Sequence, residues 1–239
     1  NFCFACMGKE NESIKQALHR NTHLHGEYYE RLPFTMFSKI NRLYGSKKGY
    51  EKLVDITRDE STLKKYYEQI HAKMKMYLFY NHLNFESFQK LMLSMKAYSP
   101  SSGVYAHVDA SGNIISASTA MNWGEYLTFQ IVNQKGVFIL AQNSGIMKHF
   151  FKSMMGIGKT KDYKKLLKCL CYKYHKENGV GVTVISTTEG DEYYNINKSL
   201  LDDKYAYFII CNDEQKLQQF KKRSEVNGHP MLFLDQPII

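Results

Sequence analysis

A glycine-rich segment directly before a long helix is the part of this sequence best suited to bind an anion. The segment runs from Gly156 to Thr160, and a helix is predicted from Asp162 to Asn178. Glycine lets a backbone approach a ligand closely, and the first turn of a helix presents N–H groups at the positive end of its dipole. These residues therefore predict a site for a phosphate-bearing ligand.

Strands and helices around this segment must position it. A β-hairpin is predicted from Gly103 to Met121, because Gly112 in its turn can take a positive φ. A further strand is predicted from Gly179 to Ser186. Apolar residues at helical spacing predict helices over residues 61–77 and 85–95. Residues 145–152 have a helical pattern, so no strand is predicted directly before the glycines.

Composition and charge limit the classes of protein to which this chain can belong. The chain has 239 residues, of which 44% are hydrophobic, enough for a sizeable core. No apolar run approaches the roughly 18 residues of a membrane helix, so no membrane-spanning segment and no membrane partner is expected. Five cysteines without framework spacing indicate the cytoplasm or another reducing compartment. A net charge of +9 is typical of a solvated basic surface or of one that meets an acidic protein surface. Arginine is scarce, which makes nucleic acid an unlikely partner.

The order of predicted elements resembles the GCN5-related N-acetyltransferase (GNAT) superfamily. From residue 50 onward it is β, α, α, β, β, β, α, β, α, β, β, with one central strand between Leu127 and Leu140 and a last strand from Met231 to Asp235. The resemblance implies an α/β fold in which a mixed central sheet is flanked by helices. It also implies coenzyme A-dependent N-acyl transfer from acetyl-CoA or another acyl-CoA. Ser153 departs from the family pattern, which has Gln or Arg there.

Residues 1–45 are similar to the closing part of such a domain. The resemblance therefore implies a tandem arrangement: the C-terminal part of a first GNAT-like domain in residues 1–45, and a second GNAT-like domain in 50–239. Strand 2–7 is predicted to pair with 34–39. Asn11 resembles the family's Asn that follows a strand and opens a helix. Expected cofactor contacts are Gly156, Ile157, Gly158, Lys159, Thr160 and Asn11.

Acyl transfer needs a base, an oxyanion donor and an acid. Glu125 and His107 are candidate bases because both lie on or near the central strands. Tyr193 or Tyr194 is the candidate acid. The acceptor would be an amine of a small molecule or of a protein. The alternative is a degenerate GNAT-like module that has a binding or structural role and catalyses no reaction.

A zinc finger is a second alternative for the N-terminus. The spacing of Cys3, Cys6, His19 and His23 matches a two-Cys two-His site. Against it, residues 2–7 also suit a buried strand, in which cysteine is an ordinary small hydrophobe. The sequence Gly156-Ile-Gly-Lys-Thr160 also ends like a nucleotide-binding P-loop, but Ser153 replaces the first glycine of that motif.

Overall fold

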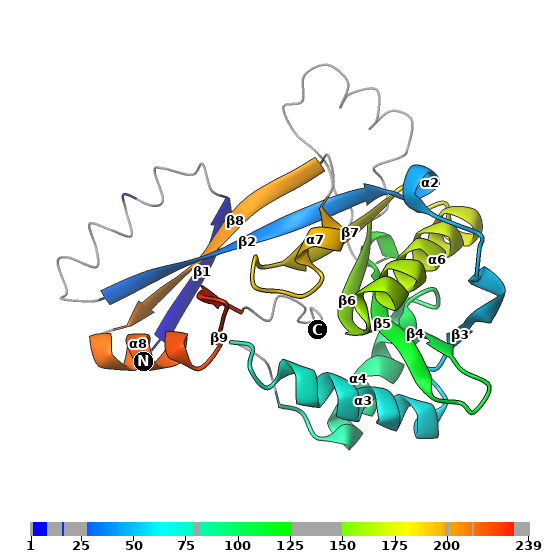
Figure 1. The fold of residues 1–239 in the computed structure, drawn as a ribbon, viewed down its shortest axis with the longest axis horizontal. Helices are drawn as coiled ribbons and strands as arrows, with labels where there is room; N and C mark the ends of the chain where they lie inside the picture. Colours follow the sequence, from blue (N-terminus) through cyan, green and yellow to red (C-terminus); the bar gives the residue numbers. More distant parts are fainter. Residues whose placement is uncertain are drawn as a thin grey trace, which may run out of the picture. The chain divides into compact units, whose positions relative to one another are not determined.

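The computed structural model describes residues 2–8, 16, 28–78, 82–125, 150–198, 201–211 and 213–231 (Figure 1). It divides into two compact units. Unit 1 comprises residues 1–37, 74–81 and 186–239, and unit 2 comprises residues 38–73 and 82–185. These limits differ from the predicted domain ranges 1–45 and 50–239, which remain a prediction.

A mixed sheet is the centre of unit 2. Its strand order is β7 (Val182–Thr187), β6 (Phe150–Gly158), β5 (Ile114–Asn122), β4 (Gly103–Val108) and β3 (Leu53–Asp55). The pairs from β3 to β6 are antiparallel, and β6 and β7 are parallel. The predicted hairpin is confirmed, with its turn at Gly112, whose φ is 75°.

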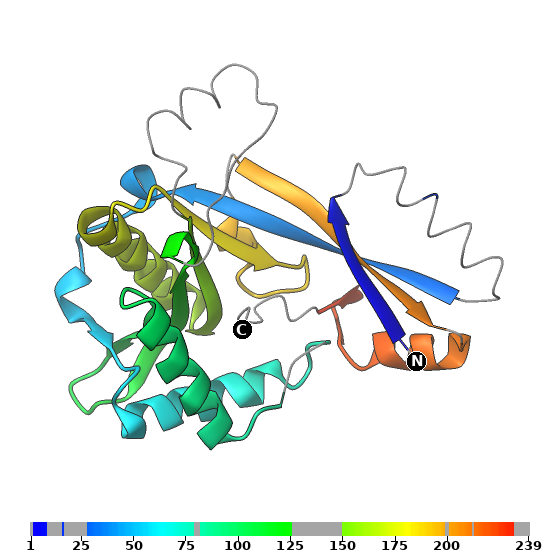
Figure 2. The same ribbon diagram turned by 180° about the vertical axis from the view of Figure 1, so that it is seen from behind.

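Helices cover both faces of this sheet (Figures 1 and 2). On one face lie α3 (Glu60–Met74) and α4 (Phe85–Tyr98), and on the other lies α6 (Thr160–Asn178). The short elements α2 (Asn41–Tyr44), η1 (Tyr50–Lys52) and η2 (Trp123–Glu125) complete the unit. The helical stripes face the core as their spacing predicts. Their fully buried residues include Leu63, Tyr66, Ile70, Leu166, Leu167 and Leu170.

Unit 1 contains a second set of strands. β1 (Phe2–Gly8) is antiparallel to β8 (Leu201–Cys211), and β8 lies between β1 and β2 (Tyr28–Ile40). The predicted pairing of strand 2–7 with 34–39 is therefore wrong, because the C-terminal strand takes the place between them. The short elements of this part of the chain are α7 (Tyr194–Asn197), which precedes β8, and α8 (Glu214–Lys222), β9 (Glu225–Val226) and β10 (His229–Pro230), which come after it.

The predicted α/β fold class, a GNAT-like mixed sheet flanked by helices, is confirmed by the order and direction of these elements. One element was predicted wrongly: Phe150–Gly158 is a strand, although residues 145–152 suggested a helix. The strand predicted between Leu127 and Leu140 and residues 232–235 of the last one lie outside the described residues. In the described part of the chain, no helix combines the length and apolar character needed to cross a bilayer.

Candidate functional site

A β-bulge interrupts strand β6. Met154 lies opposite Thr119 and Ile157 lies opposite Ala117, so two residues of β6 face a single residue of β5 between these pairs. The two are Met155 and Gly156. Met155 has a φ of 49°, which a residue other than glycine rarely adopts. Such bulges locally redirect the backbone out of the regular ladder.

Two side chains of α3 fix the peptide groups of this bulge. The hydroxyl of Tyr66 donates to the carbonyl of Met155 at 2.7 Å, and the Lys73 ammonium donates to the carbonyl of Gly156 at 2.9 Å. Because a peptide unit is planar and trans, each contact also fixes the direction of the next N–H group. The N–H groups of Gly156 and Ile157 therefore point away from these α3 side chains.

Among the described residues, the pairing of β6 with β7 ends before this bulge. The parallel pairing of β6 with β7 covers Phe150, Phe151 and Lys152, which lie opposite Val182, Thr183 and Val184. Beyond Lys152, β6 continues to Gly158 with no paired strand on this side among the described residues. Backbone polar groups must find partners, so such an edge is suited to a ligand that pairs with main chain.

The helix that follows this edge begins without a side-chain cap. Its N-cap residue is Lys159, whose side chain has no acceptor for the first-turn N–H groups. The carbonyl of Lys159 accepts from the N–H groups of Asp162 and Tyr163 at 2.8 and 2.9 Å. Within the described residues, the N–H groups of Thr160 and Lys161 have no acceptor. These two groups and the helix dipole form the candidate anion site.

Gly156 and Gly158, predicted to form a ligand-binding loop, serve packing inside the sheet. A β-carbon on Gly158 would lie 2.6 Å from the carbonyl oxygen of Ile115, and its φ is 112°. A β-carbon on Gly156 would collide with the ring of Tyr163. The prediction of a glycine loop needs correction, because both residues belong to the end of a strand. This also rules out the P-loop interpretation, which requires a loop between strand and helix.

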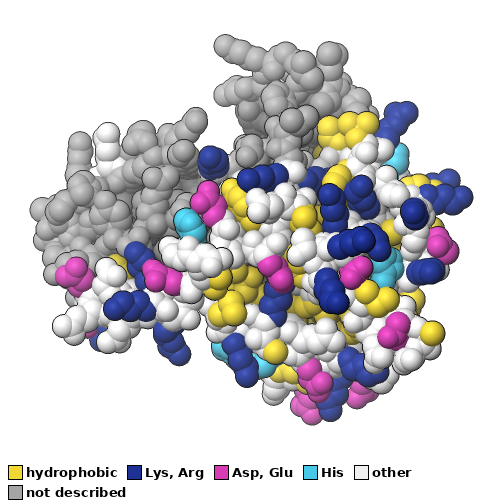
Figure 3. Space-filling model, viewed as in Figure 1, with side chains coloured by type: hydrophobic (Ala, Val, Ile, Leu, Met, Phe, Trp, Pro, Cys, Tyr) yellow, Lys and Arg dark blue, Asp and Glu magenta, His cyan; other side chains and the backbone are white. Residues whose placement is uncertain are grey.

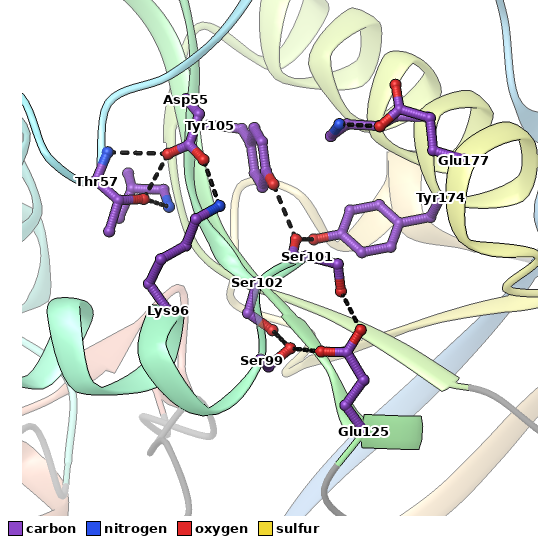
Figure 4. Close-up of polar contacts among 12 residues, drawn as sticks. Asp55, Thr57, Lys96, Ser99, Ser101, Ser102, Tyr105, Glu125, Tyr174 and Glu177 are labelled. Atoms are coloured by element: carbon purple, nitrogen blue, oxygen red, sulfur yellow. Dashed lines mark hydrogen bonds and ion pairs between the residues drawn. The ribbon is translucent and has the colours of Figure 1, made fainter.

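Glu125, a candidate base, holds a neighbouring loop (Figure 4). Its carboxylate accepts from the Ser101 hydroxyl at 2.7 Å, from the Asn122 amide at 3.0 Å and from the Ser99 hydroxyl. Glu125 follows the end of β5 that pairs with Phe151, whereas the other end of β5 pairs with Gly158. The structure therefore places Glu125 at the opposite end of β6 from the start of α6.

His107, the other candidate base, lies on β4, opposite Ser116, which in turn lies opposite Gly158. It is thus two strands from β6. Its Nε2 atom is buried with no hydrogen-bond partner. Burial lowers the pKa of His107, a hydrogen bond to the backbone of Gly49 raises it, and the net direction is downward. The folded protein therefore favours neutral His107.

We expect His107 to make the protein less stable in mild acid. Its folded pKa is lowered, so its contribution is fully present above the unfolded pKa of about 6.5 and is lost as pH falls below that value. The fluorescence of Trp123, the single tryptophan, reports urea unfolding. Between pH 7.5 and 5.5 the wild-type midpoint should fall further than that of His107→Gln. His175→Gln, at an exposed position on α6, is the control and should behave as wild type. Equal slopes for all three proteins would contradict the expectation.

The remaining predicted residues lie in unit 1 or outside the described residues. Tyr194 is the first residue of α7, in unit 1, where its ring meets that of Phe37 edge-on at 5.3 Å. Asn11 lies outside the described residues. So do His19 and His23, while Cys3 and Cys6 lie in β1. Among the residues that the structure describes, no cluster of three or more His, Cys, Asp or Glu could hold a metal.

Partly buried polar contacts tie the edge of the sheet to α4 and α6 (Figure 4). The hydroxyls of Tyr105 and Tyr174 both donate to the carbonyl of Ser101, at 2.8 and 2.6 Å. Asp55 accepts from Lys96 at 2.6 Å. Burial raises the pKa of Asp55, but hydrogen bonds from Lys96 and Thr57 outweigh it and lower the pKa. All these groups are mutually satisfied, which makes the contacts a structural support.

Sequence reasoning missed the roles of Tyr66 and Lys73. They lie about 90 and 80 residues before the bulge that they hold, and no local motif marks them. An amphipathic pattern on α3 places Tyr66 on the buried face, which is the one signal that the sequence offered.

No protein-family model and no curated protein matches the sequence. Several solved structures are similar to this chain. N-myristoyltransferase of Saccharomyces cerevisiae with bound myristoyl-CoA is similar at 10% identity and a TM-score of 0.49, covering 85% of this chain and 59% of that one. A GCN5-related N-acetyltransferase of Kribbella flavida is similar at 9% identity and a TM-score of 0.45, covering 88% of this chain and 44% of that one. The chain thus spans about half the length of these solved proteins.

Proposed function

We propose that the protein is a coenzyme A-dependent N-acyltransferase. The observation that supports this best is the sequence of features along β6. Pairing with β7 ends at Lys152, a bulge follows at Met155 and Gly156, and the uncapped start of α6 follows at Thr160. Along β6 the redirected peptide comes first, the edge beyond it continues without a β7 partner to Gly158, and the anion site follows. An acyl-CoA carries its groups in the same order: a thioester carbonyl, an amide-bearing arm and a pyrophosphate.

Each feature has a role in this proposal. The open edge of β6 pairs with the pantetheine amides. The Thr160 and Lys161 N–H groups hold the pyrophosphate at the positive end of the α6 dipole. The N–H of Gly156, oriented through Tyr66, and the N–H of Ile157, oriented through Lys73, stabilise negative charge on the carbonyl oxygen during transfer. Bound acyl-CoA supplies the activated acyl group, and an amine of a small molecule or of a protein is the acceptor.

Replacing Thr160 by proline tests the pyrophosphate site without removing the helix. Proline is favoured at the first helical position, and Lys159, with φ −60° and ψ 145°, already has the extended conformation that precedes proline. The variant loses one N–H donor. A hydrogen bond to a charged group contributes about 1.5–3 kcal/mol, so coenzyme A should bind about tenfold to a hundredfold more weakly in a calorimetric titration.

Thr160→Ala is the matched control, because it loses the side chain and keeps the N–H group. It should bind coenzyme A like the wild type. Equal coenzyme A affinities for Thr160→Pro and Thr160→Ala would show that the pyrophosphate does not bind at the start of α6. A wild-type protein that does not bind coenzyme A at all would overturn the proposed function.

A non-catalytic acyl-CoA-binding module is the second candidate. It is favoured by the placement of the two candidate bases: Glu125 is held by three donors, and His107 lies two strands from β6. The two candidates differ in turnover. Acetyl-CoA incubated with the protein and a panel of amines releases free thiol if the protein is an enzyme. Tight binding without release would favour the module.

A further inference from the structure

The positive charge of this protein is concentrated on one face of unit 2. The two segments 41–52 and 159–168 contain nine Lys and Arg residues and two acidic ones, a net +7 out of the +9 of the whole chain. Dark-blue side chains gather over α6 and α2 in Figure 3. We call this set the basic face. Its members are Arg42, Lys47, Lys48, Lys52, Lys159, Lys161, Lys164, Lys165 and Lys168.

The two segments lie side by side in the structure. The N–H of Ser46 donates to the carbonyl of Lys168 at 3.0 Å, and the Cys169 thiol donates to the carbonyl of Lys48 at 3.3 Å. The Lys168 ammonium also lies over the ring of Tyr44, 5.6 Å from its centre. The basic face is therefore one continuous surface, formed by a helix and the loop packed against it.

The lysines of α6 form a stripe that acidic groups barely offset. Lys161, Lys164, Lys165 and Lys168 recur three and four residues apart, so they share one side of the helix. Like charges at this spacing destabilise a helix. In the described part of the chain, Lys165 alone among them has a carboxylate at ion-pair distance, Asp162 at 3.7 Å. The stripe thus lowers helix stability and attracts an anionic partner.

An apolar side chain protrudes beside these charges. Leu43 on α2 is 79% exposed, and its neighbour in the chain, Arg42, is exposed as well. The inward side of α2 carries Asn41, whose side chain bonds to Val180, and Tyr44, which packs on the core. Leu43 thus projects outward because α2 is anchored by its other side. Ile40, 37% exposed, precedes α2.

We propose that the basic face docks on an acidic phospholipid bilayer. Clustered lysines are attracted to anionic headgroups, and a protruding leucine adds affinity by entering the boundary between headgroups and acyl chains. A bilayer accepts such a leucine anywhere, whereas a protein partner would need a matching pocket. Nucleic acid fits less well, because the basic face holds a single arginine, Arg42. Bases of single-stranded nucleic acid stack on exposed aromatic rings. Among the described residues, the large exposed aromatic side chain is that of Tyr98, which lies at the end of α4 and outside the basic face.

Vesicle co-sedimentation of the full chain tests this docking. The wild type should bind phosphatidylcholine vesicles that contain phosphatidylserine, and should bind less at high salt and without the acidic lipid. Lys47→Glu with Lys164→Glu should weaken that binding by about tenfold or more. Lys64→Glu with Lys90→Glu changes the net charge equally on exposed positions of α3 and α4 and should bind nearly as the wild type. Equal losses in the two variants would overturn the proposal.

A Leu43→Ser variant, which leaves the charge of the basic face unchanged, separates a bilayer from a soluble polyanion. It should weaken vesicle binding and leave binding to heparin unchanged, because heparin has no apolar layer. If Leu43→Ser binds vesicles like the wild type, or if the wild type binds heparin or RNA but no acidic vesicle, the bilayer is the wrong partner. Neither result touches the acyl-CoA proposal, which is tested separately by comparing the coenzyme A affinities of Thr160→Pro and Thr160→Ala.

Discussion

Gly158→Ala should remove about 3–5 kcal/mol from the free energy of unfolding, a large part of the stability of an ordinary domain. Two costs add at this position. Alanine is strained at a φ of 112°, and its β-carbon would lie 2.6 Å from the Ile115 carbonyl oxygen and 2.8 Å from the Ser116 side chain. Two of the three nearest atoms are backbone of the paired strand β5, so they cannot move aside as a flexible side chain would. Urea unfolding followed by Trp123 fluorescence reports the loss.

Gly112→Ala is the control for the conformational part of this cost. Gly112 also has a positive φ, 75°, but a β-carbon there would meet no atom within 4 Å. That variant should lose about 1–2 kcal/mol. Similar losses in the two variants would mean that the sheet around Gly158 relaxes, and that packing does not require glycine there. A Gly158 variant is therefore a test of stability, and Thr160→Pro is the cleaner test of ligand binding.

Element order was predictable because hydrophobic period and turn chemistry are local. The hairpin at Gly112 and the helix that ends at Asn178 both follow from short stretches of sequence. Strand β6 was not predictable in this way. It has strands on both sides over part of its length, so its residues lack polar alternation, and a short apolar run does not distinguish a strand from a helix.

The candidate site was half predictable for a related reason. The start of α6 is visible in sequence because a helix terminus is a local feature. The bulge at Met155 is visible only in the register of β6 against β5, which depends on residues more than 30 positions apart. The glycines mark the end of strand β6, and packing accounts for both of them. Gly156 makes room for the Tyr163 ring, and Gly158 makes room for β5, so neither had to be explained by a ligand.

In the proposed acyl transfer, Lys73→Met should slow the reaction by about tenfold to a hundredfold while the affinity for acyl-CoA stays unchanged. The Lys73 ammonium holds the Gly156 carbonyl at 2.9 Å, and thereby orients the N–H of Ile157. Methionine keeps most of the apolar length of lysine and loses the donor. The peptide group can then turn away from the position in which it stabilises the carbonyl oxygen. Stopped assays of thiol release from acetyl-CoA with an amine acceptor give kcat and KM separately. The decrease should appear in kcat, and KM should stay unchanged.

Lys65→Met on the same helix is the matched control. Lys65 also approaches a backbone carbonyl, that of Gly112 at 3.5 Å, but at the hairpin turn and away from the bulge. It should keep the wild-type kcat, and Lys73→Arg should recover part of the lost rate by restoring a donor. Trp123 fluorescence establishes that each variant is folded before it is assayed. A folded Lys73→Met enzyme with full kcat would show that the peptide after the bulge does not stabilise the transition state, and the oxyanion donor would then have to be sought elsewhere on β6.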